Sequence, residues 1–493
     1  MIPILFLALL VAWVSVAEAA IQFDLLDIEG LNRFKTIHSR YPHLARSTIE
    51  TLRTKAKYAL ENPHPYSVIN TSITPPNGNK HEFYSLAAYW WPNCDGIEDV
   101  QDPDRDCPYV RKDGQWVPDI KKATDPNDFN EMTADVTTLA VAYTIFGDEK
   151  YAEKAALLLN TWFLNIDTYM KPSVNFGQVI RGKSHNNKGR SEGILELRTI
   201  VYIPQALALI EKSETVGKRL TRPLKSWFNK YSTWLVTSPL GVREKNHPNN
   251  HGTFYIAQTA ACLHFAGRDV EARNLINDFA DGYFKDQIDK DGKQPLETAR
   301  TKVYHYECFN LLALVYIARL SIKLDGINLW ETETHYGVTI KAAVDHLVKV
   351  TNNLLGDMQA GKELKERLFA FRTPLYAARD YYGDPDGEYG PLLEKLLELP
   401  GGPIEYWALW SPYTLEGLSD DTYETYADEW NLISEDRSGM LPDVMINGGL
   451  LAAIILMWLL RKQKRRSLVR LLVIIACLCA TAAFYNILKI HTL

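Results

Sequence analysis

The residues best suited to chemistry lie in two short segments of the chain, near positions 250 and 300. The first segment contains Asn249, Asn250 and His251, followed by a glycine that would let a ligand approach the backbone and then by aromatic residues. The second contains Arg300 and Tyr306. An amide, an imidazole, a guanidinium and a phenol form a set that can remove a proton from the carbon next to a carboxylate group.

Each residue of this set has an expected role. Asn250 and His251 would hydrogen-bond the carboxylate as it gains enediolate character, an electrostatic contribution that is often the largest in such a reaction. Tyr306 would take the carbon-bound proton and deliver it to the departing glycosidic oxygen, and Arg300 would lower the pKa of the phenol. This β-elimination on a uronic acid chain is the chemistry of a polysaccharide lyase.

Structural explanations compete with these roles. Asn249 is a favoured residue type for a helix N-cap, which leaves Asn250 and His251 to face a substrate. Tyr304 and His305 compete with Tyr306, and we expect Tyr304 to be structural and His305 to support the site. If Arg300 and Tyr306 lay on one helix, six residues would turn them about 600° apart, so Arg300 must precede the helix or reach across it.

Four ordered motifs resemble those of the alginate lyase superfamily and span roughly residues 26–420. One is Asn249-Asn250-His251-Gly252 followed by Arg300, Tyr306 and Phe309, and its arginine-to-tyrosine spacing is most similar to the glucuronan lyase branch. The others are the aromatic segment His81–Asn93, the segment Asn175–Gln178, and the segment Gly189–Glu196. The resemblance implies an all-α fold, an (α/α) toroid built as an incomplete barrel of helical hairpins.

Further residues are expected to bind substrate. Sugar faces stack on aromatic rings, and among Tyr89, Trp90 and Trp91 we expect one buried ring and two facing the cleft. Gln178 belongs to one of the similar motifs, and Asn249 and His305 flank the catalytic residues. Arg190 would either bind a uronate carboxylate or form a structural ion pair with Glu196.

The helical periodicity of the sequence agrees with such a fold. Apolar residues recur at three- and four-residue steps in the ranges 134–145, 151–163, 194–210, 220–237, 255–265 and 270–287. Asp148 is expected to cap the helix that contains Tyr151, and Gly147, Gly241 and Gly267 are expected to stand where helices stop. No strand series is recognisable. The segment 92–128 is rich in Asp, Pro and Gly and predicts a long surface loop covering one end of the cleft.

Two other functions remain open at this level. An (α/α) toroid can also carry a glycoside hydrolase with paired carboxylates, for which the candidates are Glu192, Glu196, Glu297 and Glu307. An inactive, membrane-tethered glycan-binding protein is the second alternative. No metal-ligand spacing is present, since Pro248 interrupts any helix between His247 and His251, and no cofactor is expected.

Composition limits the partners and the compartment. The net charge of −6 leaves no basic stripe for nucleic acid. Residues 1–19 form an apolar run ending in Ala-x-Ala, which predicts a secretory signal peptide, and Asn70-Thr71-Ser72 is an N-glycosylation acceptor. We expect Cys94 and Cys107 to pair, and the two other cysteines of the body to be free and buried.

The C-terminal part predicts a membrane anchor. Two apolar runs within 444–490 flank the basic link Arg461–Arg466, a pattern typical of a transmembrane hairpin whose link faces the cytosol. A GPI attachment signal is the alternative. The predicted organisation is a signal peptide at 1–19, a catalytic toroid at 20–430, a connector at 431–443 and the hairpin at 444–490. The catalytic domain would be a monomer in the secretory pathway, extracellular or at the cell surface.

The expected substrate is a 1,4-linked polyuronate. Glucuronate and mannuronate share the configuration at C4 and C5, and in both the C5 proton and the O4 leaving group lie on the same side. One tyrosine could therefore act as base and then as acid. Glucuronan is the first expectation, from the arginine-to-tyrosine spacing, and alginate the second.

Overall fold

A computed structural model of the chain describes residues 26–40, 45–182, 187–356, 368–399 and 406–409. All of them belong to the first of two units, Met1–Gly417 and Leu418–Leu493, into which the chain divides. The predicted signal peptide, connector and transmembrane hairpin lie outside the described residues.

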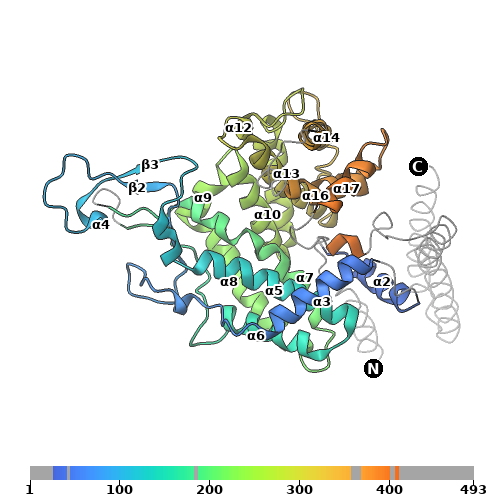
Figure 1. Cartoon of the computed structure of the whole chain (residues 1–493), viewed down its shortest axis with the longest axis horizontal. Helices are drawn as coiled ribbons and strands as arrows, with labels where there is room; N and C mark the ends of the chain where they lie inside the picture. The colour runs from blue at the N-terminus through green and yellow to red at the C-terminus, as the bar shows by residue number, and fades with distance from the viewer. Residues whose placement is uncertain (1–25, 41–44, 183–186, 357–367, 400–405, 410–493) are drawn as a thin grey trace, which may run out of the picture. The chain divides into compact units, whose positions relative to one another are not determined.

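A series of inner helical segments forms the centre of the fold, and each packs against the next in chain order (Figure 1). Helix α10 is buried along almost its whole length, because its residues are apolar or small on every side. It packs against its neighbours in the series on both sides. The inner segments are α5 (Asp125–Phe146), the 3₁₀ segment η3 (Ser191–Tyr202) continuing into α7 (Ile203–Ile210), α10 (Asn250–Phe265), α13 (Val303–Lys323) and α16 (Arg372–Tyr382).

Amphipathic helices cover this inner series. In α3, for example, the buried positions Ile49, Leu52, Ala56 and Ala59 recur at three- and four-residue steps and form one stripe. The covering helices are α2 (Ile28–Arg40), α3 (Arg46–Glu61), α6 (Glu149–Phe163), α8 (Thr221–Thr237), α11 (Asp269–Asp281), α14 (Ile340–Gly356) and α17 (Tyr389–Glu398). Short segments link them: η1 (Val68–Asn70), α4 (Pro103–Asp106), η2 (Pro118–Lys122), η4 (Gly217–Leu220), α9 (Pro239–Lys245), η5 (Tyr283–Asp286), α12 (Pro295–Thr298), η6 (Phe369–Phe371) and η7 (Tyr406–Leu409).

The mostly helical architecture agrees with the predicted toroid of helical hairpins, and each predicted helix is present. Asp148 caps α6 by accepting a hydrogen bond from the N–H of Lys150, as expected. Gly147 ends α5 with a positive φ of 74°, which glycine adopts without strain. The expectation for Gly241 was wrong, because it lies inside the short helix α9. The helix predicted at 270–287 stops earlier, at Asp281, and a separate 3₁₀ turn follows.

Two small sheets, which the sequence analysis did not predict, lie beside the helices. Strand β1 (Tyr84–Leu86) pairs in parallel with β4 (Phe176–Val179). Strand β2 (Trp90–Pro92) pairs antiparallel with β3 (Tyr109–Arg111), with Trp90 opposite Arg111. At three or four residues each, these strands are too short to show an alternating pattern in the sequence.

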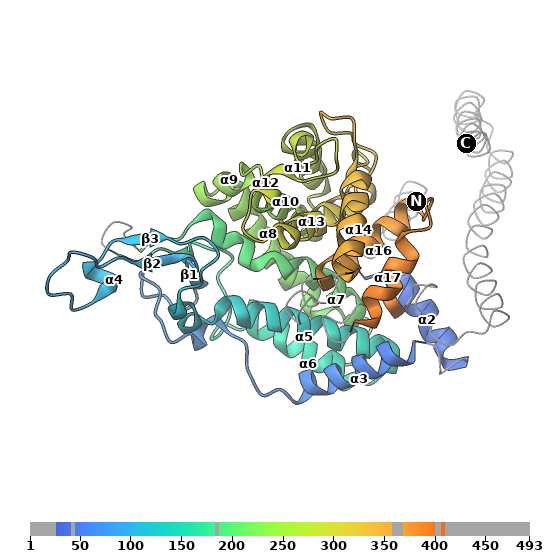
Figure 2. The same cartoon turned by 45° about the horizontal axis from the view of Figure 1, so that its top comes forward.

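The β2–β3 hairpin replaces much of the loop predicted at 92–128. With α4 it lies at one end of the described body, beyond the helices, in both views (Figures 1 and 2). A disulfide between Cys94 and Cys107 closes it, as predicted. Cys262 and Cys308 are free and buried, also as predicted.

Within the described residues, one helical stretch is long and apolar enough to cross a membrane by length and composition, Ser191–Ile210. Of its most apolar window, 72% is buried inside the protein, so it occupies the position of a core helix.

Candidate active site

The first turn of α10 carries two of the predicted catalytic residues. Asn249 is the N-cap, as expected, and its side chain accepts a hydrogen bond from the N–H of His251 at 3.2 Å. Asn250 and His251 therefore occupy the positive end of the helix dipole, which favours a bound anion. Gly252 was expected to let a ligand approach the backbone. The structure gives a different reason for a glycine at this position, because a Cβ there would lie 1.9 Å from the carbonyl oxygen of His247.

Asn250 is fixed by a buried carboxylate. Its backbone N–H donates to Oε1 of Glu297, and its side-chain Nδ2 donates to Oε2, both at 2.7 Å. Asn250 and Glu297 are each 1% exposed. Burial raises the pKa of Glu297, and the hydrogen bonds from Asn250 oppose that rise. We expected Asn250 to face the substrate, but it lies deeper in the protein. One of its two side-chain N–H groups already donates to Glu297.

His251 is oriented by a second buried carboxylate. Its Nδ1 lies 2.7 Å from Oε1 of Glu244, a residue of α9 that is 1% exposed. A carboxylate at this distance favours a proton on Nδ1 and leaves Nε2 to face other groups. The ring of His247 lies beside it, 3.6 Å from the other Glu244 oxygen, and burial lowers the pKa of His247.

Arg300 and Tyr306 meet as the sequence geometry required. Arg300 lies in the turn before α13, and Tyr306 lies on the first turn of that helix. Nη2 of Arg300 donates to the Tyr306 hydroxyl at 2.9 Å, and its guanidinium carbon is 3.9 Å from the ring centroid. Asp113, from the segment after β3, is 3.5 Å from the same Nη2. The hairpin segment therefore reaches the catalytic cluster.

The hydroxyl of Tyr306 has a second neighbour, the hydroxyl of Tyr89, at 3.4 Å. Burial is the largest cause that shifts the pKa of Tyr306, and it raises that pKa above the ordinary value. Arg300 lowers it, as expected, but burial and Tyr89 outweigh the arginine, so the net direction is opposite to the expected one. Without a bound substrate, Tyr306 holds its proton at neutral pH.

The aromatic run differs from its expectation, because Tyr89, Trp90 and Trp91 are all half-buried. Tyr89 faces Tyr306, whereas the Trp91 indole N–H donates to the carbonyl of Gln115 at 2.9 Å. The Arg190 guanidinium lies 5.7 Å from the Trp90 ring centroid.

Arg190 does not pair with Glu196. Its partner is Glu192, two residues away, and Glu196 instead accepts a hydrogen bond from Ser85. Burial lowers the pKa of Arg190, and the charge of Glu244 opposes that shift. Arg190 therefore lies close enough to interact electrostatically with Glu244, the carboxylate that orients His251. Gln178 has a positive φ of 49°, and its side-chain Nε2 donates to the carbonyl of Glu192 at 3.3 Å.

Tyr304 and His305, the two residues of α13 that competed with Tyr306 for the catalytic role, have different contacts from Tyr306. Tyr304 is bonded to Thr351 at 3.0 Å, which agrees with a structural role. His305 is exposed and stacks on Phe309 with 5.9 Å between ring centroids. Phe309 packs against Phe254 of α10, with centroids 4.2 Å apart, and so joins the two helices that carry the cluster.

Sequence reasoning missed the residues that hold the cluster in place. Glu244, Asp113 and the supporting role of Glu297 come from three segments that the fold brings together. Glu244 precedes His251 by seven residues but lies on a different helix. No spacing rule links a carboxylate to an imidazole across such a break. In the sequence Glu244 stands between Arg243 and Lys245, and Asp113 between Lys112 and Gly114, so neither context indicates a buried acid.

The four glutamates proposed for a hydrolase are all engaged elsewhere. Glu297 and Glu307 are 1% and 2% exposed, and Gln294 donates to Glu307 at 3.3 Å. Glu192 and Glu196 are bonded to Arg190 and Ser85. A hydrolase requires two carboxyls that reach opposite sides of one glycosidic bond, whereas each of these four carboxyls has a partner within the protein.

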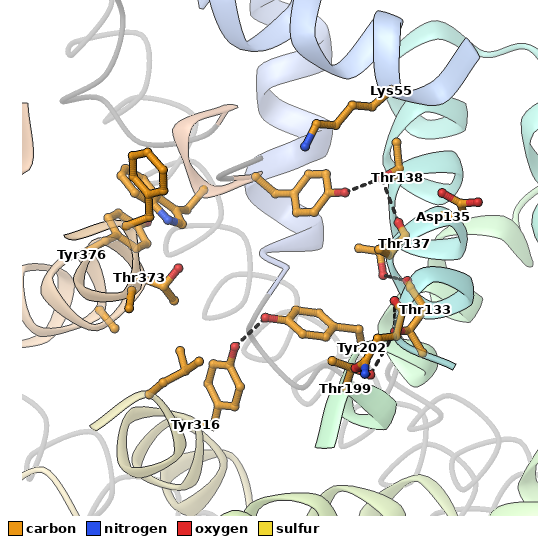
Figure 3. A pocket seen from close by; sticks show the side chains of 18 of the residues that line it. Lys55, Thr133, Asp135, Thr137, Thr138, Thr199, Tyr202, Tyr316, Thr373 and Tyr376 are labelled. Atoms are coloured by element: carbon orange, nitrogen blue, oxygen red, sulfur yellow. Dashed lines mark hydrogen bonds between the residues drawn. The ribbon is translucent and has the colours of Figure 1, made fainter. Parts of the chain in front are cut away.

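A cavity of about 700 Å³ lies apart from this cluster. It is lined by hydroxyl-bearing and aromatic side chains of α3, α5, η3, α13 and α16, and Tyr202 and Tyr316 meet in its wall (Figure 3). None of the predicted site residues lines it. Within the part of the chain that the structure describes, no group of three or more His, Cys, Asp or Glu side chains could hold a metal ion.

Comparisons with known proteins agree with the arrangement. The alginate lyase family model matches residues 67–354, more than half of the chain and the whole catalytic cluster. The chain belongs to the alginate lyase family. Members of this family are polysaccharide lyases that act on polyuronates, so the enzyme is a polysaccharide lyase. No curated protein sequence matches the chain.

Two solved structures are similar to the chain. An alginate lyase from Bacteroides ovatus is 29% identical, with a TM-score of 0.69, and the match covers 80% of this chain and 99% of that one. Alginate lyase A1-III from Sphingomonas species A1 is 16% identical, with a TM-score of 0.39, and the match covers 72% of this chain and 92% of that one. The second similarity is too low to support an argument about the site.

Proposed function

We propose that this alginate lyase family enzyme cleaves a 1,4-linked polyuronate by β-elimination, with Tyr306 as base and then acid. The hydrogen bond from Arg300 to the Tyr306 hydroxyl is the observation that carries the proposal. A guanidinium that donates to a phenol oxygen stabilises the phenolate needed to remove a carbon-bound proton. The ordinary alternatives for a buried tyrosine, a carbonyl or carboxylate acceptor, do not create that basicity.

The proposed reaction conserves protons and electrons in two steps. Before the first step, Tyr306 releases its own proton to solvent, and Arg300 stabilises the phenolate. The phenolate then takes the C5 proton, and the C5–H electron pair moves into the carboxyl group to form an enediolate. That pair then forms the C4–C5 double bond as the C4–O4 bond breaks. The proton passes from Tyr306 to O4, which leaves as the hydroxyl of the new chain end and regenerates the phenolate.

The first turn of α10 would stabilise the enediolate. As an imidazolium, His251 can donate from Nε2 while its Nδ1–H is held by Glu244, and Asn250 is fixed by Glu297. Both lie at a helix N-terminus, where developing negative charge is favoured. Donors held in place before the reaction need no rearrangement when the charge forms, which makes them effective.

For the sugar, glucuronan is our first proposal and alginate the second. Proton removal from C5 and protonation of O4 occur on one side in both glucuronate and mannuronate, which suits a single tyrosine. The Bacteroides ovatus structure described as an alginate lyase supports alginate as a substrate to be tested beside glucuronan.

A panel of polyuronates tests the reaction and the sugar together. Incubation with glucuronan, polymannuronate and polyguluronate should release an unsaturated product that absorbs in the ultraviolet, with the highest rate on glucuronan. New reducing ends without that absorbance would indicate a hydrolase. Binding of a polyuronate without either signal would indicate an inactive glycan-binding protein.

We also propose that the enzyme acts outside the cell and is anchored at its C-terminus. The signal-like segment at 1–19 and the basic link between two apolar runs at 444–490 support this location. The Cys94–Cys107 disulfide suits an oxidising compartment, and Asn70 of the acceptor motif is exposed.

A further inference from the structure

Arg198 is a cation in the inner series of helical segments for which the reaction proposed above has no use. It belongs to η3, and its guanidinium carbon lies 5.6 Å from the ring centroid of Phe309 on α13. Phe309 follows Tyr306 by three residues and therefore lies one helical turn below it. Arg198 thus stands next to the base of the catalytic cluster.

Two further contacts fix this position relative to the cluster. Phe309 packs against Phe254, which follows His251 by three residues on α10, so the two rings lie one turn below the two catalytic side chains. Gln258 of α10 donates to the carbonyl of Ile194 at 3.2 Å, which holds η3 against the same helix. Arg198, His251 and Tyr306 therefore project from three neighbouring inner segments.

Arg198 is half-buried and lacks the carboxylate partner that such a guanidinium usually has. Among the described residues, no carboxylate lies within 4.0 Å of it, and its one hydrogen bond is a long contact of 3.4 Å to the carbonyl of Leu195 in its own segment. Arg181 shows the contrast, because it is 8% exposed and pairs with Asp104 at 2.8 Å and with Asp119 at 3.0 Å. Partial burial of a charge without a partner is unfavourable, which points to an anion that binds beside Arg198.

The nearest acid is already engaged. Glu196 accepts a hydrogen bond from Ser85, whose hydroxyl oxygen also accepts one from the N–H of Gln178 at 2.6 Å. Burial raises the pKa of Glu196 to about 8, while Ser85 and Arg198 oppose that rise. This buried carboxyl therefore compensates the arginine charge less than an ion-paired carboxylate would. Burial also lowers the pKa of Arg198, although a guanidinium remains charged.

We propose that Arg198 binds the carboxylate of the uronate residue next to the one that reacts, and that it is a specificity-determining residue. The inference rests on the proposed polyuronate substrate, in which every sugar carries a carboxylate. The reacting carboxylate is held by His251 and Asn250, so a cation elsewhere in the inner wall is available to the neighbouring sugar. A planar guanidinium matches a carboxylate with two parallel hydrogen bonds.

Binding experiments in the Tyr306→Phe background test this without turnover. Titration calorimetry compares Arg198→Gln with the parent, using the polyuronate and the same polymer with its carboxyl groups reduced to alcohols. Arg198→Gln should weaken polyuronate binding by roughly 10- to 100-fold, the range for a hydrogen bond to a charged group. Binding of the reduced polymer should stay the same. Arg198→Lys, which keeps the charge but not the fork, should recover part of the affinity.

Two controls separate this role from a structural one. Arg268→Gln removes another arginine, one paired with Glu271 at 2.6 Å, and should leave binding unchanged. The effects of Arg198→Gln and His251→Ala should add, because the two residues hold different carboxylates. A strongly non-additive pair would place both on one carboxylate and overturn the assignment. Equal weakening for charged and reduced polymers would also overturn it, since that pattern indicates altered packing.

The outcomes distinguish this inference from the proposed reaction. Polyuronate binding that depends on Arg198, together with no unsaturated product from the wild type, would overturn the lyase mechanism alone. Unsaturated product with unchanged binding in Arg198→Gln would overturn the role of Arg198 alone. If the parent does not bind any polyuronate, both are wrong. If Arg198→Gln fails to fold, Arg198→Lys with a normal melting temperature should still weaken polyuronate binding, to a smaller extent, and leave binding of the reduced polymer unchanged. Unchanged binding of both polymers by Arg198→Lys would then overturn the assignment.

Discussion

Arg300 contacts Tyr306 at two places, donating from Nη2 to the hydroxyl at 2.9 Å while its guanidinium carbon lies 3.9 Å from the ring centroid. A guanidinium that both stacks and donates fixes the ring position and the direction of the oxygen lone pairs together. A lysine ammonium carries the same charge but cannot satisfy both contacts. The two contacts therefore require an arginine at position 300, and a lysine there would not be a conservative replacement.

Arg300→Lys should lower kcat by roughly 10- to 100-fold, because the loss of one charge-assisted hydrogen bond corresponds to about 1.5–3 kcal/mol. KM should change less, since the contact is made to the base and not to the substrate. Steady-state kinetics on the best polyuronate measure both. A kcat equal to that of the wild type would mean that charge alone is sufficient.

Tyr306→Phe should reduce turnover by at least the roughly 10²- to 10⁴-fold associated with general acid–base catalysis, while substrate binding is retained. Tyr304→Phe is the matched control, because it removes a hydroxyl from the same helix whose partner is Thr351. That variant should keep its turnover and change only stability. Near-normal turnover in Tyr306→Phe would move the base to another residue, with His251 the first to examine.

His251→Ala should lose about 3–4 kcal/mol of transition-state stabilisation, by analogy with removal of an oxyanion-hole donor. Glu244→Gln leaves the imidazole in place but removes the buried negative charge beside Nδ1. It should therefore lower kcat to a smaller extent than His251→Ala and alter the pH profile of kcat. An effect confined to KM in either variant would show that these groups hold only the ground state.

The raised pKa of Glu196 predicts that the free energy of unfolding depends on pH. Burial raises its pKa in the folded protein from 4.5 to about 8, so the folded state binds this proton more tightly than the unfolded chain does. The favourable contribution is fully present below about pH 4.5 and is lost progressively as the pH rises through about 8. Relative to wild type, Glu196→Gln should gain melting temperature between pH 5 and pH 8. A constant difference across that range would contradict the raised pKa.

Truncation after Asp443 should release a soluble, folded and active enzyme, whereas the full chain should partition with membranes and resist carbonate extraction. A tag in the Arg461–Arg466 link should report a cytosolic location. Release of the full chain by a GPI-specific phospholipase would instead show that the last apolar run is a processed signal. An insoluble truncated form would show that this part of the chain is needed for folding.

The sequence predicts many of the helices because a helix depends on the local spacing of apolar residues and on residue types that favour its first or last turn. Asp148 and Asn249 are recognisable as caps for that reason. The rotation per residue of a helix also predicts that Arg300 lies before the helix that carries Tyr306. The turn around Gly241 was misplaced, since a short helix of seven residues has almost no period to recognise. The strands β1 to β4 were missed for the same reason.

The supporting residues of the site could not be predicted, because their roles depend on contacts between segments that are distant in sequence. Glu297 holds Asn250 across 47 positions, and Tyr89 meets Tyr306 across 217. Of the two alternatives for Arg190, the ion pair with Glu196 was wrong, because Arg190 pairs with Glu192, one helical turn earlier in the sequence. The direction of the Tyr306 pKa also depends on burial, which no local pattern reports.

The Cys94–Cys107 disulfide constrains a hairpin that borders the catalytic cluster. Tyr89 precedes β2, and Asp113 follows β3, so both side chains reach Arg300 and Tyr306 from the base of a loop that Cys94 and Cys107 tie together. Helices α10 and α13 pack directly on one another and do not depend on that bond. Reduction of the disulfide should therefore free the hairpin that carries Tyr89 and Asp113 while Arg300 and Tyr306 stay in place.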